Sequence, residues 1–316
     1  MFLDGKPAGA ATPLITRRQV HRAVPQAARP QGPPTGIDWR LEAWPWSVVG
    51  CLAGIAFNAM GLLDSWTPGS HTADGITHPT FRKGSGPGVI VIHEIPGITP
   101  AVIAFAEEVV ARGFTVVLPS LFGREEAPAT VRESLRSVAS VCVSREFSLF
   151  ALGRTSPVAT WLRSLARELH AELGGPGVGA VGMCLTGGFA LAMLADAPVA
   201  APVLAQPASP APVGKARKAD LGLSPGDLAS VKTKVAAGCQ VLGLRYDRDP
   251  AVGARFDTLR RELGENFIAV EFPGRKHATL TEHRQQDGVD RVLTFFEEKL
   301  KVASDQQPDE ASRSPP

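Results

Sequence analysis

The sequence is poor in the residues that carry metal, redox and nucleic-acid chemistry. Its 316 residues include four cysteines, which lie far apart and form no Cys-x-x-Cys pair, so neither a zinc site nor a redox dithiol is predicted. His93-Glu94 begins like a metalloprotease motif, but no second histidine stands four residues after the first, and Pro96 breaks the helix that the motif needs. We therefore expect no metal and no cofactor.

The chain also lacks a strong charge of either sign. Its net charge is +2, both signs are mixed through the sequence, and no basic stripe alternates with aromatic residues. Nucleic acid is therefore not an expected partner. The scarcity of cysteine fits a reducing compartment, so we expect a cytoplasmic protein. No feature of the sequence sets the oligomeric state.

Long apolar runs are absent except for residues 47–63. This run lies at the short limit for a spanning helix of roughly 17–25 residues, and it contains Asn58 and three glycines, so membrane anchoring is disfavoured. We expect residues 1–60 to form a disordered basic arm that ends in this apolar segment, unless the natural chain starts at Met60. Residues 303–316 are polar and end in Pro-Pro, which predicts a disordered tail.

Between these ends, continuous apolar strands alternate with helices. We expect strands at residues 88–93, 114–118, 178–183, 199–205, 239–246 and 267–272. We expect helices at residues 100–113, 156–173, 186–194, 252–263 and 289–301, and one more that begins at Ser224-Pro225. The alternation predicts one α/β domain over residues 61–302, with a mainly parallel, twisted sheet covered by helices on both faces. In such sheets the ligand binds beyond the carboxyl ends of the strands.

Cys184 stands where the strand at residues 178–183 turns directly into a helix. The glycine two residues earlier, Gly182, lets strand and helix approach without a clash, and a side chain on this kind of turn projects as a nucleophile. Thr186 occupies the position of the usual second glycine. The alternative interpretation is a small apolar residue that packs at a strand end.

Other reactive side chains follow the ends of the neighbouring strands. His93-Glu94, Asp247, Asp249 and His277 each come shortly after a predicted strand. The chain order of cysteine, acid and histidine is that of the α/β-hydrolase fold. A neutral imidazole can take the thiol proton while a carboxylate fixes its tautomer. Asp247 directly follows its strand, whereas Asp249 opens a helix and could serve as a cap, so both remain candidates for the acid.

Four segments together resemble the dienelactone hydrolase family, which are cysteine-dependent α/β hydrolases. The resemblance runs from about residue 63 to residue 300. The segments are His93-Glu94-Ile95-Pro96-Gly97-Ile98, Gly182-Met183-Cys184-Leu185, Asp249-Pro250-Ala251-Val252 and Gly274-Arg275-Lys276-His277. The resemblance implies an α/β-hydrolase fold and a carboxylic ester hydrolase of the carboxymethylenebutenolidase type.

The resemblance also implies roles for individual residues. Cys184 would be the nucleophile, His277 the base and Asp249 the acid, because the family's acid precedes an apolar pair that opens a helix. Glu94 would hold the resting thiol and accept its proton when substrate arrives. The backbone N–H groups of Ile95 and Leu185 would form the oxyanion hole.

The chain departs from the family pattern at the residues that bind the substrate. The family grips the carboxylate of dienelactone with arginines and a tyrosine, one arginine lying four residues after the histidine, and here that position is Thr281. Arg145 and Arg154 could supply a different anion clamp. We therefore expect a small-molecule ester or lactone as substrate. The alternative is a catalytically silent scaffold that binds a ligand or a partner protein.

Overall fold

The computed structural model describes residues 61–144, 146–147, 152–208 and 214–301. The predicted arm at residues 1–60, the tail at 303–316 and Arg145 lie outside the described residues, so these expectations stay predictions. None of the helices within the described ranges has the length and apolar character needed to cross a lipid bilayer.

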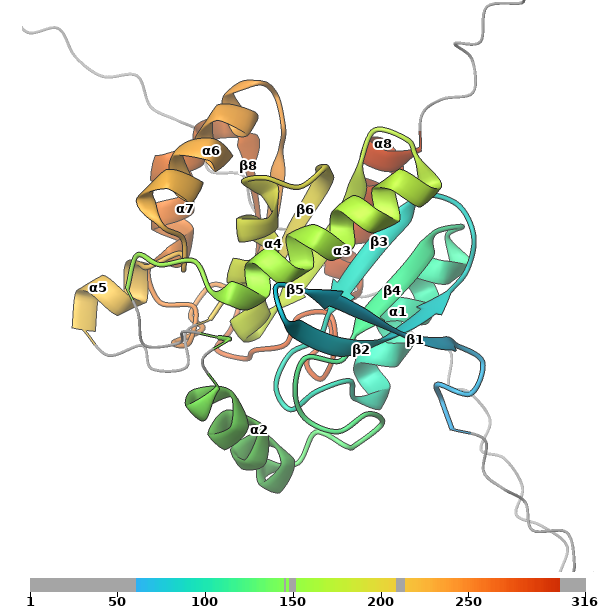
Figure 1. Cartoon of the computed structure of the whole chain (residues 1–316). Coiled ribbons are helices and arrows are strands. Elements are labelled where there is room, and N and C mark those ends of the chain that lie inside the picture. The colour runs from blue at the N-terminus through green and yellow to red at the C-terminus, as the bar shows by residue number, and fades with distance from the viewer. Residues whose placement is uncertain (1–60, 145, 148–151, 209–213, 302–316) are drawn as a thin grey trace, which may run out of the picture. The chain divides into compact units, whose positions relative to one another are not determined.

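The described residues form one eight-stranded sheet (Figure 1). Its strands are β1 (Thr67–Ala73), β2 (Ile76–Lys83), β3 (Gly88–Ile92), β4 (Thr115–Pro119), β5 (Val178–Met183), β6 (Val199–Ala205), β7 (Val241–Tyr246) and β8 (Phe267–Phe272). Their order across the sheet is β1-β2-β4-β3-β5-β6-β7-β8. All neighbouring strands from β4 to β8 pair in parallel, and β1 and β2 add an antiparallel hairpin beside β4. The predicted mainly parallel sheet of an α/β-hydrolase fold is confirmed.

Helices connect the parallel strands. They are α1 (Pro100–Ala111), α2 (Val131–Val143), α3 (Pro157–Leu173), α4 (Gly187–Leu194), α5 (Gly214–Ala219), α6 (Pro225–Ala236), α7 (Arg255–Leu263) and α8 (Gln286–Leu300). Local sequence explains several starts: the side chain of Thr99 accepts a hydrogen bond from the Val102 N–H at 3.3 Å, and Pro100 occupies the first turn of α1. The helix expected from residue 252 begins instead at Arg255, because Gly253 adopts a φ of +60°.

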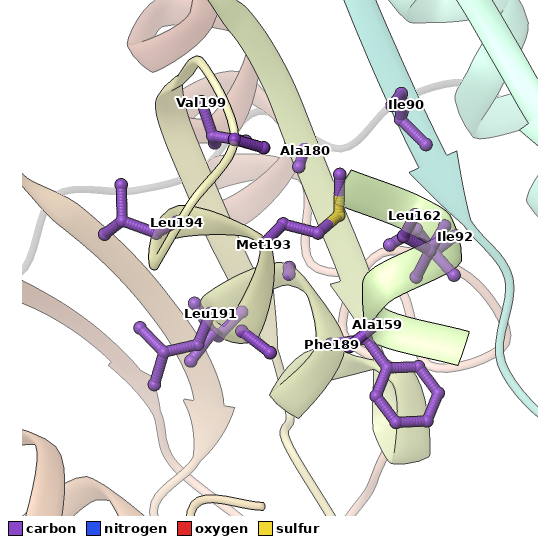
Figure 2. Close-up of a cluster of buried hydrophobic side chains, with 14 of the residues drawn as sticks. Ile90, Ile92, Ala159, Leu162, Ala180, Phe189, Leu191, Met193, Leu194 and Val199 are labelled. Carbon is purple, nitrogen blue, oxygen red and sulfur yellow. The ribbon is translucent and has the colours of Figure 1, made fainter. Parts of the chain in front are cut away.

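The sheet separates two apolar layers because successive side chains of a strand point to opposite faces. In β3, Ile90 and Ile92 belong to one buried cluster, and Val89 and Val91 belong to the other. The first cluster packs beneath α3, α4, α6 and α7, and Figure 2 shows side chains from β3, β5, α3 and α4 within it. The second packs beneath α1 and α8 on the other face. Both faces are thus covered, as predicted.

The topology brings the carboxyl ends of five strands to one edge. β3, β5, β6, β7 and β8 are consecutive neighbours in the sheet, and they run parallel to one another. Glu94 follows β3, Cys184 follows β5, Gln206 follows β6, Asp249 follows β7 and His277 follows β8. Residues that are distant in the sequence therefore meet at this edge.

Candidate active site

Cys184 occupies a strained turn between β5 and α4. Its φ is +56°, a conformation that residues with a Cβ rarely adopt, and its side chain is half-buried. The turn is tight enough that a Cβ on Gly182 would lie 2.1 Å from the backbone oxygen of Thr186. Gly182 is therefore required for the strand and the turn to approach. The geometry is that of the predicted nucleophile turn.

Thr186 stabilises this turn without the conformational freedom of glycine. Its backbone is helical, with φ −80° and ψ −7°, and its side chain is completely buried. The hydroxyl accepts a hydrogen bond from the Met183 N–H at 2.8 Å. The hydroxyl oxygen also lies 2.9, 3.1 and 3.2 Å from the carbonyl oxygens of Met183, Ile92 and His93, to which it can donate its proton. The hydroxyl thus joins the turn to the end of β3, a role that the sequence alone did not reveal.

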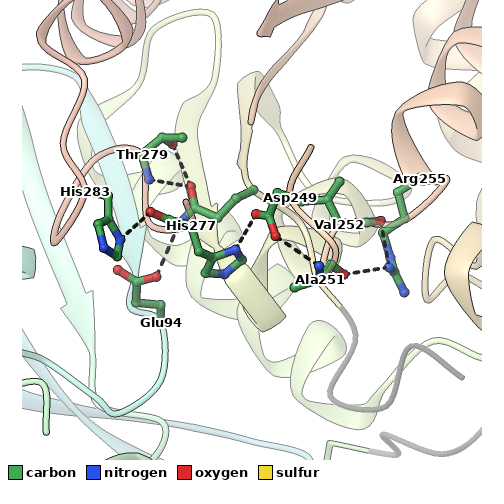
Figure 3. A network of polar contacts seen from close by, with 9 residues as sticks. Glu94, Asp249, Ala251, Val252, Arg255, His277, Thr279 and His283 are labelled. Carbon is green, nitrogen blue, oxygen red and sulfur yellow. Dashed lines mark hydrogen bonds and ion pairs between the residues drawn. The ribbon is translucent and has the colours of Figure 1, made fainter. Parts of the chain in front are cut away.

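Asp249 is buried and pairs with the partly buried His277 beside the turn. The Nδ1 atom of His277 lies 2.5 Å from Oδ2 of Asp249, whose other oxygen accepts from the Ala251 N–H at 3.0 Å (Figure 3). Asp249 is 6% exposed. Asp247, the other candidate, is half-exposed and accepts from the Gly274 N–H at 2.7 Å. The geometry therefore favours Asp249 over Asp247 as the partner of His277.

The environment of His277 favours its protonated form. Burial opposes a charge on the ring, but the Asp249 hydrogen bond, the Cys184 sulfur and the charge of Asp249 outweigh burial and raise the pKa of His277 to about 10. Its Nε2 atom is buried and has no hydrogen-bond partner in the described part of the chain. The effect of Cys184 on the pKa of His277 places its sulfur near this ring.

Glu94 lies in a closed polar network at the same edge. One carboxylate oxygen bonds to the Thr281 hydroxyl, and the other accepts from Gln206 Nε2 at 3.3 Å. Gln206 Oε1 in turn accepts from the N–H and the hydroxyl of Thr279, at 3.0 and 2.6 Å. Burial raises the pKa of the Glu94 carboxyl, although Thr281, His277 and Gln206 act in the opposite direction. None of the hydrogen bonds described for Glu94 goes to Cys184.

Gln206 is a site residue that the sequence analysis missed. It is fully buried, its φ is +37°, and its backbone N–H donates to the Leu244 oxygen at 2.6 Å. Through its side chain it fixes Thr279, two residues after His277, against Glu94. The available signal was its position, because Gln206 directly follows β6 at the reactive edge of the sheet.

His93 is a structural neighbour rather than an acid–base group. The Leu121 N–H donates to its Nε2 at 3.1 Å, so the ring proton is on Nδ1, which donates to the Glu94 carbonyl oxygen at 3.1 Å. Burial lowers the pKa of His93 to about 4, against smaller opposing effects from Glu94 and Glu125. His93 is therefore neutral near pH 7, and it positions the segment that carries Glu94.

The remaining predicted residues are placed as follows. Within the described ranges, the N–H groups of Ile95 and Leu185 are not the donors of any hydrogen bond in turns, loops or caps. Both residues lie at the reactive edge, one after β3 and one after Cys184. Arg154 is exposed on the loop before α3, and Arg145 lies outside the described residues. Among described side chains, no group of three or more histidine, cysteine or acidic residues could hold a metal ion.

Comparison with solved structures identifies the same architecture elsewhere. A dienelactone hydrolase from Anabaena variabilis ATCC 29413 shares 19% identity and a TM-score of 0.54, over 75% of this chain and 98% of that one. A protein from Klebsiella pneumoniae subsp. pneumoniae MGH 78578, provisionally named a dienelactone hydrolase, is 17% identical to this chain and superposes with a TM-score of 0.53. The match covers 74% of this chain and 99% of that one. At these identities the likeness establishes the fold.

Sequence comparison establishes the family. No curated protein sequence matches the chain. The model of the dienelactone hydrolase family matches residues 76–300, which contain every part of the site described above. This match spans well over half of the sequence, so the chain belongs to the dienelactone hydrolase family.

Proposed function

We propose that this protein hydrolyses a carboxylic ester or lactone through a thioester on Cys184. Membership of the family supports a hydrolase. The observation that carries the finer proposal is the Asp249–His277 pair, whose ring interacts with the Cys184 sulfur and whose Nε2 has no hydrogen-bond partner among the described residues. Without such a base and turn, a half-buried cysteine would be an inert packing residue.

The reaction divides into acylation and deacylation. The proton of the Cys184 thiol passes to His277 Nε2, where the raised pKa of the imidazole favours an imidazolium–thiolate pair, and the thiolate attacks the carbonyl carbon of the ester. The N–H groups of Ile95 and Leu185 donate to the oxyanion that forms. As the tetrahedral species collapses, His277 returns the proton to the leaving alkoxide, and the acyl group stays on sulfur. Water then attacks the thioester, with His277 again as base, and the acid leaves as the thiol is restored.

Glu94 enters this proposal as a group that acts when substrate is bound. Its oxygens bond to Thr281 and Gln206 in the free protein, so acceptance of the thiol proton requires a rearrangement. A raised pKa makes its carboxylate a stronger base. The positive charge of His277 attracts the ionised form of Glu94 and so acts against the rise of the Glu94 pKa.

The substrate is proposed only as an ester or lactone. Thr281, at the position where the family resemblance implies a carboxylate-binding arginine, bonds instead to Glu94. Arg154 is the described candidate for a replacement cation, and it is exposed to solvent. Around the thiol, Cys184 and Ile95 pack against the buried cluster that includes Phe122, Phe147 and Phe189, which favours an apolar acyl group.

The test compares Cys184→Ala with Cys142→Ala. Both cysteines are half-buried and free, but Cys142 lies on α2, away from the His277 pair. We expect Cys184→Ala to abolish hydrolysis of p-nitrophenyl butyrate and of dienelactone, and Cys142→Ala to retain it. Acid quenching during turnover should also trap an acyl adduct on the peptide that contains Cys184. Turnover by Cys184→Ala at the wild-type rate would show that another group performs the chemistry.

A further inference from the structure

Tyr246 is a buried residue at the end of β7, three positions before the proposed acid Asp249. It is 3% exposed, and the chain contains no other tyrosine. Its hydroxyl lies 2.6 Å from the carbonyl oxygen of His283 and 2.6 Å from Nε2 of Gln285. A carbonyl oxygen only accepts, so the hydroxyl donates to His283 and accepts from Gln285. The strand that leads to Asp249 is therefore bonded to the segment that carries His277.

His283 holds the backbone of His277. Its Nδ1 atom lies 2.8 Å from the carbonyl oxygen of His277, as Figure 3 shows. Because that oxygen only accepts, Nδ1 carries a proton and donates it. The backbone N–H of His283 also donates to the carbonyl oxygen of Ala278 at 3.0 Å. His283 thus binds two consecutive carbonyl groups at the base, while Tyr246 binds its own carbonyl group.

The segment between His277 and His283 needs this support because part of it is strained. Ala278 directly follows His277 and has a φ of +57°, a conformation that residues with a Cβ rarely adopt. Its carbonyl oxygen accepts from the N–H groups of Thr281 and His283 at 3.3 and 3.0 Å. A strained residue keeps its conformation only when the surrounding contacts determine it. Loss of the bond to Tyr246 would therefore release the backbone beside the imidazole.

The proposed acid and base are consequently connected twice. The direct connection is the 2.5 Å contact between Asp249 Oδ2 and His277 Nδ1. In the second, the Asp249 N–H donates to the carbonyl oxygen of Tyr246 at 3.2 Å. The Tyr246 hydroxyl donates to His283, whose ring donates to His277. The second connection runs through backbone groups, so it fixes where the imidazole stands relative to the carboxylate.

We propose that Tyr246 and His283 are positioning residues of the active site, which hold the imidazole of His277 within bonding distance of Asp249. The inference rests on the proposed function, in which His277 is the base. Both residues act through the backbone of His277, and neither gains nor loses a proton in the reaction. Loosening this connection misaligns the base but leaves substrate binding unchanged, so kcat falls while KM stays nearly constant.

The test compares Tyr246→Phe with Thr115→Val in steady-state hydrolysis of p-nitrophenyl butyrate. Thr115 is the matched control, because it is 1% exposed and its hydroxyl donates to the Gly86 carbonyl oxygen at 2.8 Å. Thr115 begins β4, so it lies at the opposite edge of the sheet from the site. We expect Tyr246→Phe to lower kcat about tenfold with KM within about twofold of wild type, and Thr115→Val to keep the wild-type kcat.

Two variants of His283 check the second half of the connection. His283→Leu removes the donor to the His277 carbonyl oxygen and should lower kcat as Tyr246→Phe does. His283→Asn should recover most of this loss, because its amide can donate in place of Nδ1. Equal values of kcat for the two His283 variants would contradict the inference. If Tyr246→Phe does not fold, this comparison provides the decision.

The low-field proton resonance of the His277 Nδ1–H reports on the pair without turnover. Asp249→Asn should abolish this resonance, which assigns it. We expect Tyr246→Phe to broaden the resonance and speed its exchange with water, and Thr115→Val to leave it unchanged. A folded Tyr246→Phe with a wild-type kcat or an unchanged resonance overturns the proposal. Failure of the proposed function would instead appear as retained hydrolysis by Cys184→Ala, with the resonance still sensitive to Tyr246→Phe.

Discussion

Replacing Thr186 by valine tests how the nucleophile turn is stabilised. Valine has nearly the same shape but no hydroxyl, so the buried Met183 N–H loses its acceptor at 2.8 Å. The carbonyl oxygens of Ile92 and His93 lose a shared donor as well. An unsatisfied buried N–H costs about 1–3 kcal/mol, and we expect the whole change to lower the free energy of unfolding by about 2–3 kcal/mol.

Urea unfolding, followed by circular dichroism, measures this loss directly. For a domain of this size, a loss of 2 kcal/mol corresponds to a fall in Tm of roughly 4–8 °C. Thr186→Ser is the matched control, because it retains the hydroxyl and loses only a methyl group, at a cost of about 1 kcal/mol. We expect ester hydrolysis to fall in Thr186→Val and to persist in Thr186→Ser. A Thr186→Val protein as stable as wild type would refute the role assigned to the hydroxyl.

Three further predictions concern the charged groups of the site. Asp249→Asn should reduce kcat about 10³–10⁴-fold, with Asp247→Asn near wild type, and equal losses in steady-state assays would contradict the pairing. The pKa of His277, about 10 when folded, exceeds its ordinary value of 6.5, so its stabilising effect is complete below pH 6.5 and is lost towards pH 10. Asp249→Asn should weaken that loss. Glu94 also has a raised pKa, so ionising it costs stability as pH rises above 4.5, and Glu94→Gln should gain stability over wild type as the pH of the urea titrations rises above that value. A difference that does not change with pH would exclude this.

The parallel strands and the order of the reactive residues could be predicted because their signals are local. Buried parallel strands are continuous apolar runs, and glycine, proline or a helix cap marks the ends of the runs from β3 to β8. The sequence also placed Cys184, Asp249 and His277 after strand ends, where the topology brings them together. Their catalytic roles remain proposals.

The hairpin and α2 were not predicted because their patterns run against the usual rules. β1 is exposed along most of its length and buries His71 rather than an apolar residue. In α2 the buried positions include Glu133 and Ser137, whereas Val131 and Leu135 are 78% and 66% exposed. A helix that buries polar residues and exposes some of its apolar ones gives a misleading periodicity.

The roles of Gln206 and Tyr246 were not identified from the sequence for a different reason. Each acquires its role only through contacts with segments far along the chain, Gln206 with Glu94 and Thr279, and Tyr246 with the backbone of His283. A single glutamine after a strand is usually a surface residue, and a single tyrosine at a strand end is ordinary because aromatic residues are enriched in strands. Only their contacts distinguish these two, and such contacts are a property of the fold.

The network around Glu94 also constrains when the site can form during folding. Glu94 and Thr281 are 187 positions apart, Glu94 and Gln206 are 112 apart, and Gln206 and Thr279 are 73 apart. No early, locally folded piece of the chain contains these partners, so the entropy of closing long loops must be spent before any of the bonds exists. The buried carboxyl thus acquires its partners only after β3, β6 and the segment following β8 have docked. A local opening of that last segment would release His277 and expose Glu94 in one event, so we expect this edge of the sheet to open as a single cooperative unit.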